Sequence, residues 1–146
     1  MSRSYVEENA QQRERLRLLV ARLSDQDLAR PLYGDWTIAA VLAHMAFWDY
    51  RAGLLLKRWR QAGAKPSPVD VDIINDAMRP LLQAISPRKG AELALEAANA
   101  IDREIEGLSQ DLIAQIQANP SLLRLDRARH RREHMDQIES ALAMKK

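Results

Sequence analysis

Residues 36–62 read WTIAAVLAHMAFWDYRAGLLLKRWRQA, and this stretch decides the fold class. Its apolar residues recur at intervals of three and four, which is the period of an amphipathic helix. Asp35 or Thr37 can cap the first turn. The sequence therefore predicts a long helix from Trp36 to about Ala62, and its apolar side carries Ile38, Val41, Leu42, Met45, Trp48, Leu55 and Trp59.

The same helical period continues on both sides of this stretch. Gly and Pro cluster at residues 31–34, 63–68 and 80–90, which are the expected connections between helices. Between these connections apolar and polar residues do not alternate over a sustained stretch, so the sequence does not indicate strands. We predict an all-α fold, a four-helix bundle of one domain (residues 1–146) with one extra short helix packed across it. The remaining helices are expected at about residues 5–23, 69–78 (short, ending near Pro80), 86–107 and 121–143, with a separate turn at 112–116.

Composition narrows the class of protein. The 22 Lys and Arg nearly balance the 20 Asp and Glu, and the net charge of +2 argues against a nucleic-acid or membrane partner. There is no Cys, so any metal must be bound by nitrogen and oxygen atoms. The first residues contain no apolar signal core, and no segment has the roughly 20 apolar residues that span a bilayer. We expect a cytoplasmic protein.

The three histidines form the most informative pattern in the chain. His130 and His134 are four residues apart, so both imidazoles lie on one face of a helix and can reach one ion. His44 lies in the long apolar helix between Val41 and Phe47, where an unpaired buried imidazole is costly. Because facing helices of a bundle commonly build metal sites, we expect the three histidines to bind one divalent ion. The alternative is that they are packed or exposed without any ligand.

Three neutral imidazoles leave coordination positions open, as Zn²⁺ uses in catalysis and as Ni²⁺ or Fe²⁺ also accepts. Such an ion supports a hydroxide, a bound thiolate or a polarised carbonyl, and the pattern is compatible with all three. Residues 130–134 also match an inverted zinc-protease motif with Glu133 as the general base. Only the 12 residues 135–146 follow His134, too few for the distant third ligand of that motif, so Glu133 is expected to be a surface charge.

Several polar residues are candidates for orienting the imidazoles, because a metal-bound histidine usually donates its other N–H to a carboxylate or carbonyl. Asn75 either lines the site or caps the short helix. The other candidates, for which a surface salt bridge is the alternative, are Asp49, Asp126, Arg127 and Gln137.

The remaining aromatic and basic residues are given structural interpretations. The arginine-rich run at residues 127–132 is expected to be a solvated face paired to Glu and Asp, because no interleaved aromatic residues support nucleic-acid binding. Another interpretation is the binding of an acidic cofactor by Arg51, Arg58 and Arg60. Core and interface packing is the expected role of Trp36, Phe47, Trp48 and Trp59.

Two stretches of this chain resemble the signatures of the DinB/YfiT-like superfamily of four-helix-bundle, metal-binding proteins. Residues 34–49 are similar to its second-helix signature, a Trp-Ser/Thr opening followed by a His and then an aromatic-Asp pair. Residues 130–138 are similar to its last-helix signature, two spaced histidines followed by Asp-Gln-Ile. The segment 69–78, with Asn75, resembles the family's linker, so the similarity covers most of the chain.

This resemblance implies a bundle with crossed connections, a divalent cation held by His44, His130 and His134, and a homodimer. Relatives include transferases and isomerases that use a low-molecular-weight thiol, and hydrolases. We therefore expect a metal-dependent enzyme, a thiol-dependent transferase or a hydrolase, acting on a small substrate. The alternatives are a non-catalytic metal-binding or stress-response dimer and a metal-free helical interaction domain.

Overall fold

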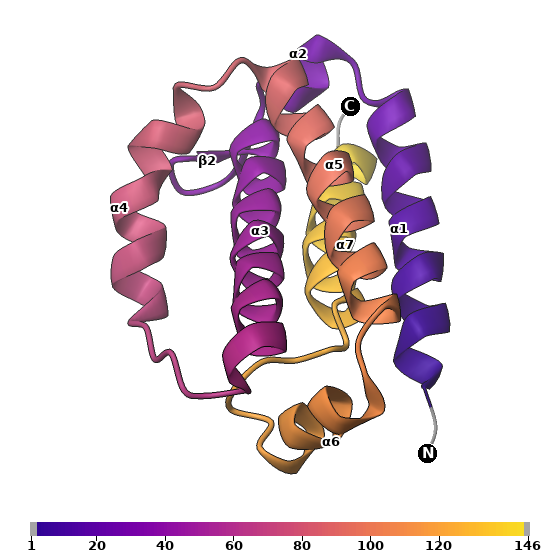
Figure 1. The fold of residues 1–146 in the computed structure, drawn as a ribbon. Coiled ribbons are helices and arrows are strands. Elements are labelled where there is room, and N and C mark those ends of the chain that lie inside the picture. The colour runs from indigo at the N-terminus through magenta and orange to yellow at the C-terminus, as the bar shows by residue number, and fades with distance from the viewer. Residues whose placement is uncertain (1–2, 145–146) are drawn as a thin grey trace.

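A computed structural model describes residues 3–144 of the chain and confirms the all-α fold (Figure 1). Four long helices form the bundle: α1 (Ser4–Arg22), α3 (Ile38–Ala62), α5 (Pro87–Glu106) and α7 (Ala128–Ala143). Three shorter helices connect or flank them: α2 (Asp25–Leu28), α4 (Val71–Gln83) and α6 (Gln110–Ala118). Within residues 3–144, no helix is long and apolar enough to cross a membrane.

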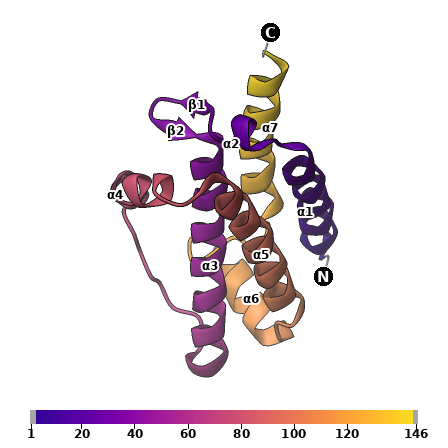
Figure 2. The same cartoon turned by 90° about the horizontal axis from the view of Figure 1, so that it is seen from above.

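The core lies between the apolar faces of the four long helices. One cluster of buried side chains joins α1, α3, α5 and α7 and includes Leu16, Leu42, Ala94 and Ile138. Helices α3 and α5 pack very closely at Gly90. A Cβ atom on this residue would stand only 3.0 Å from the Ala39 carbonyl oxygen, so there is no room for a larger side chain. This packing places α3 in the middle of the molecule, with His44 on it (Figures 1 and 2).

A small hairpin precedes α3, although the sequence predicted no strands there. Strand β1 (Pro31–Tyr33) pairs antiparallel with β2 (Trp36–Thr37), and Gly34 turns the chain with a φ of +49°, a conformation that favours glycine. The prediction failed because so short a hairpin leaves no sustained alternation to detect. Thr37, rather than Asp35, caps α3 by accepting a hydrogen bond from the Ala40 N–H.

Helix α4 continues to Gln83, so the prediction that it ends near Pro80 was wrong. Pro80 has no N–H to donate to the Asp76 carbonyl, but both residues are exposed and water can satisfy that carbonyl. The helix lies outside the four-helix core against α3 and β2, as predicted (Figures 1 and 2).

The last part of the chain also differs from the prediction. The turn expected at residues 112–116 is the helix α6, which Ser109 caps through the Leu112 N–H. The last helix begins at Ala128 and not near Ser121, because the side chain of Asn9 on α1 binds the backbone of residues 125–128. His130 consequently lies in the first turn of α7.

Candidate metal centre

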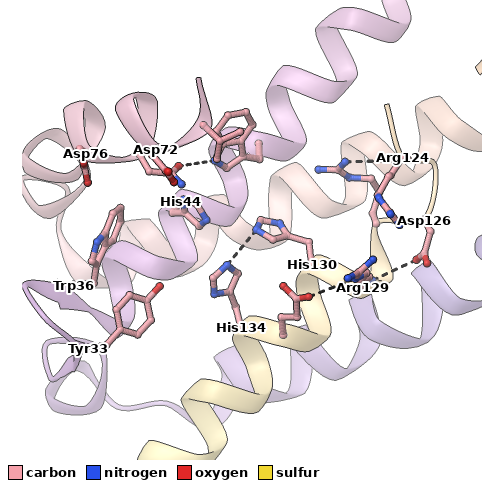
Figure 3. A pocket seen from close by; sticks show the side chains of 15 residues that line it. Tyr33, Trp36, His44, Asp72, Asp76, Arg124, Asp126, Arg129, His130 and His134 are labelled. Atoms are coloured by element: carbon pink, nitrogen blue, oxygen red, sulfur yellow. Dashed lines mark hydrogen bonds and ion pairs between the residues drawn. The ribbon is translucent and has the colours of Figure 1, made fainter. Parts of the chain in front are cut away.

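The three histidines meet on one side of the bundle, although 86 residues separate His44 from His130 (Figure 3). The side chain of His44 is buried in α3, and those of His130 and His134 are partly buried on α7. One ligand nitrogen from each ring lies within 4.8 Å of the other two. Among the described residues this is the group that could hold a metal ion, with ring centroids 4.7–5.4 Å apart.

The hydrogen bonds around the rings fix the tautomers of His134 and His130. His134 Nδ1–H donates to Oε1 of Gln137 at 2.9 Å, because an amide oxygen can only accept. The deprotonated nitrogen of His134 is therefore Nε2, which accepts a hydrogen bond of 3.1 Å from Nε2–H of His130. Nδ1 of His44 is buried and has no hydrogen-bond partner among residues 3–144.

The environment favours the neutral form of each imidazole. Burial and, to a smaller extent, the proximity of His134 lower the pKa of His44 to about 4, and the Asn75 side chain opposes this shift. Burial also lowers the pKa of His130 to about 3, together with the charges of the other two histidines and of Arg127 and Arg131. The pKa of His134 is lowered by burial, against the effect of Gln137. All three rings are therefore neutral at pH 7, the form that binds metals.

A pocket of about 760 Å³ opens beside the histidines. The hairpin and α3 supply aromatic side chains to its wall, α4 supplies Asn75 and two aspartates, and residues 124–133 supply arginines and acids (Figure 3). The residues besides the histidines are Tyr33, Trp36, Trp48, Val71, Asp72, Asn75, Asp76, Arg124, Asp126, Arg127, Arg129 and Glu133.

The aromatic residues divide between this pocket and the core. Trp36 lies edge-on to the His44 ring at 5.6 Å, and Trp48 Nε1–H donates to Oδ1 of Asn75 at 2.9 Å. Both tryptophans are half-buried and line the pocket, so the prediction of core packing was wrong for them. Trp59 is buried in the core, as predicted, whereas Phe47 is exposed. A helical period identifies a buried stripe, but it does not show where a cavity interrupts that stripe.

Of the residues predicted to orient the imidazoles, some lie beside the histidines and others pair elsewhere. Gln137 contacts His134, and Asn75 lines the pocket near His44. Asp49 pairs instead with Arg127 at 3.0 Å and with Arg131 at 3.5 Å. Asp126 accepts a hydrogen bond from the Arg129 N–H at 3.3 Å.

The arginine-rich run is only partly solvated, which corrects the prediction. Arg129 and Arg132 are exposed, but Arg127 and Arg131 are buried. Arg131 makes two hydrogen bonds of 2.8 and 2.9 Å to Asp102 on α5. The available signal was the spacing 127, 131, 135 and 138, which puts these arginines on the same helix face as the buried Met135 and Ile138.

The basic residues of α3 do not line the pocket. Arg51 donates to the Ser67 carbonyl and stacks over Trp48, Arg60 pairs with Glu104, and Arg58 is exposed. Glu133, expected to be a surface charge, is exposed at the pocket rim, where it pairs with Arg129 at 3.5 Å.

Comparison with known proteins agrees with this architecture. No curated protein and no solved structure shows a significant match to the chain. The family model described as the mycothiol maleylpyruvate isomerase N-terminal domain matches residues 10–136, a range that contains all three histidines. The chain therefore belongs to the family of the mycothiol maleylpyruvate isomerase N-terminal domain, within the DinB-like superfamily.

Proposed function

We propose that His44, His130 and His134 hold one divalent cation, Zn²⁺, Ni²⁺ or Fe²⁺, and that the adjoining pocket is the active site of a metal-dependent enzyme. The observation that carries the proposal is the convergence of three neutral imidazoles from two helices at the edge of a large pocket.

The donor set fits such an ion. Two nitrogens bound to one tetrahedral zinc ion stand about 3.3 Å apart, given Zn–N bonds of about 2.0–2.1 Å. The Nε2 atoms of His130 and His134 are 3.1 Å apart. An unpartnered buried nitrogen such as Nδ1 of His44 is costly, and a cation bound to that nitrogen would remove the cost. When bound, the cation lowers the pKa of a coordinated water or thiol and polarises a carbonyl group.

The chain's own residues would bind and orient a small substrate. The indole of Trp36 and the ring of Tyr33 offer apolar surface beside the histidines (Figure 3). On the other side, Arg124 and Arg129 supply positive charge for an anionic group. A low-molecular-weight thiol is the co-substrate we favour, because the matching family model is named for mycothiol. The reaction would then be a thiol-dependent transfer or isomerisation, and hydrolysis is the second choice.

A non-catalytic metal-binding or stress-response dimer is the alternative. It is favoured by apolar side chains exposed on α3 and α4, of which Leu54 is 60% and Ile73 65% exposed. In that proposal these side chains would contribute to an apolar protein interface. In that function the ion would only hold the bundle together, whereas the enzyme needs the ion to be reachable from the pocket.

Metal analysis of protein purified without a histidine tag tests the proposal. We expect about one divalent ion per chain. Both His130→Ala and His134→Ala should abolish tight binding, whereas Arg132→Ala, an exposed residue between them, should not. Full occupancy in either histidine variant would refute the site.

A second measurement separates the enzyme from the structural ion. N-acetylcysteine added to the Co²⁺-loaded protein should change its visible absorption, because a thiolate that reaches the ion alters its ligand field. An unchanged spectrum at saturating thiol would favour the non-catalytic dimer.

A further inference from the structure

Asn9 on α1 connects the first helix of the chain to the start of the last one. Its side chain is 1% exposed and makes three hydrogen bonds. Nδ2–H donates to the Leu125 carbonyl at 2.9 Å, and Oδ1 accepts from the N–H groups of Arg127 and Ala128, both at 2.8 Å. One buried amide thus holds the backbone of residues 125–128 in place.

These bonds do the work of a helix cap. The first N–H groups of a helix have no partner inside it and usually bind the side chain of the preceding residue. In α7 that residue is Arg127, whose side chain makes no such bond. Asn9 supplies the acceptor from another helix, and Asp126 accepts from the next N–H, that of Arg129.

A second set of contacts holds Arg131, in the first turn of α7. The backbone carbonyl of Asn9 accepts from Nη1 of Arg131 at 3.0 Å, and Asp102 holds the same guanidinium from α5. His130 lies between the two anchored points, Ala128 and Arg131. His134 lies one turn further along, where Gln137 orients its ring.

We propose that Asn9 is the positioning residue that places His130 in the candidate metal site. Without its side chain, the first turn of α7 loses its acceptor and the chain from 125 to 128 loses its tether. The imidazole of His130 then no longer stays beside His134, while His44 and His134 keep their own supports in α3 and in the middle of α7.

Three variants test this role. Asn9→Leu keeps a side chain branched at Cγ, although a larger one, and removes all three side-chain bonds. Asn9→Asp keeps the acceptor for Arg127 and Ala128 but cannot donate to Leu125. Ile113→Ala in the core of α6 is the control, since it removes a buried side chain from a helix that makes no substantial contact with α7.

Two measurements are made on each variant. The first is the nuclear Overhauser contact between the rings of His130 and His134, measured in metal-free protein. The centroids of these two rings are 4.7 Å apart. We expect Asn9→Leu to lose it, and Asn9→Asp and Ile113→Ala to keep it. The second is the Zn²⁺ affinity by chelator competition, a measurement that rests on the proposed function. Asn9→Leu should bind about 10- to 100-fold more weakly, the usual effect of residues that support a ligand.

The outcomes are distinct. If Asn9→Leu keeps both the ring contact and the affinity, Asn9 does not position His130. If Ile113→Ala loses as much as Asn9→Leu, the effect is general loss of stability and the proposal is also refuted. If the parent protein binds no Zn²⁺, the proposed function fails, and the ring contact in metal-free protein still decides the role of Asn9.

Discussion

Replacing His44 by alanine gives the sharpest test of whether the three histidines form one site. His44 is the only candidate ligand from α3, and its Nδ1 has no partner among the described residues. In metal-free protein two effects oppose each other. The lost side chain leaves a cavity worth about 2–3 kcal/mol, and removing an unpaired buried nitrogen returns about 1–3 kcal/mol. The free energy of unfolding should therefore lie between about 2 kcal/mol below and about 1 kcal/mol above the parent's.

Added Zn²⁺ should stabilise the parent protein more than the His44→Ala variant. At a Zn²⁺ concentration of about 1,000 times the parent's Kd, binding stabilises the parent by about 4.1 kcal/mol. Loss of one of three ligands should weaken affinity by more than the roughly 100-fold seen for supporting residues, so the variant gains less than about 1.4 kcal/mol at the same concentration. For a chain of this size the Tm rises by about 8–16 °C in the parent and by less than about 6 °C in the variant.

Thermal unfolding followed by circular dichroism, with and without Zn²⁺, measures both quantities. Phe47→Ala is the matched control, since this exposed aromatic residue lies on α3 three residues from His44 and does not line the pocket. It should keep the full gain from metal. If His44→Ala also keeps it, α3 supplies no ligand and the proposed site is wrong.

Three further predictions concern stability and assembly. Because the pKa values of His44 and His130 in the fold, about 4 and about 3, lie below the ordinary 6.5, only the unfolded chain takes up protons as the pH falls below 6.5. In urea unfolding of the metal-free protein, the free energy of unfolding should therefore not change with pH above 6.5. Below pH 6.5 it should fall by up to about 1.4 kcal/mol per histidine and pH unit, down to about pH 4. A free energy that does not change with pH would contradict the burial of neutral rings. Asp102→Ala leaves Arg131 buried without its main partner and should cost about 3–5 kcal/mol, whereas the exposed Glu106→Ala should change stability by less than about 0.5 kcal/mol in the same assay; equal effects would mean that the buried pair contributes nothing. Light scattering should give the mass of a dimer, and Leu54→Lys with Ile73→Lys should give a monomer of unchanged helicity; a monomeric parent would refute the predicted homodimer.

The sequence was most informative where the deciding interaction is local. The helical period of residues 36–62 follows from side chains one turn apart, and the helix ends at Ala62 as predicted. The shared face of His130 and His134 likewise depends only on a spacing of four residues. Such features need no knowledge of the rest of the fold.

It was least informative where a distant partner decides the structure. The start of α7 depends on Asn9, which is 119 residues from Ala128 in the chain. The burial of Arg131 depends on Asp102 in another helix, and the helical spacing that puts Arg131 on the buried face does not identify this partner. The pocket-lining position of Trp36 depends on a hairpin too short to be read from alternation.

The charges around the candidate site limit what can bind there. Arg127 and Arg131 lie beside His130 and disfavour its protonation, which keeps the ring free for a metal at neutral pH. The same positive charge opposes a divalent cation, because three neutral imidazoles bring no negative charge of their own. Compensation can come from Asp49, which pairs with both arginines, from the carboxylates at the pocket rim, and from an anionic ligand on the ion. If the proposed ion is bound, a substrate that presents a thiolate or a carboxylate to it would therefore suit this pocket better than a neutral one.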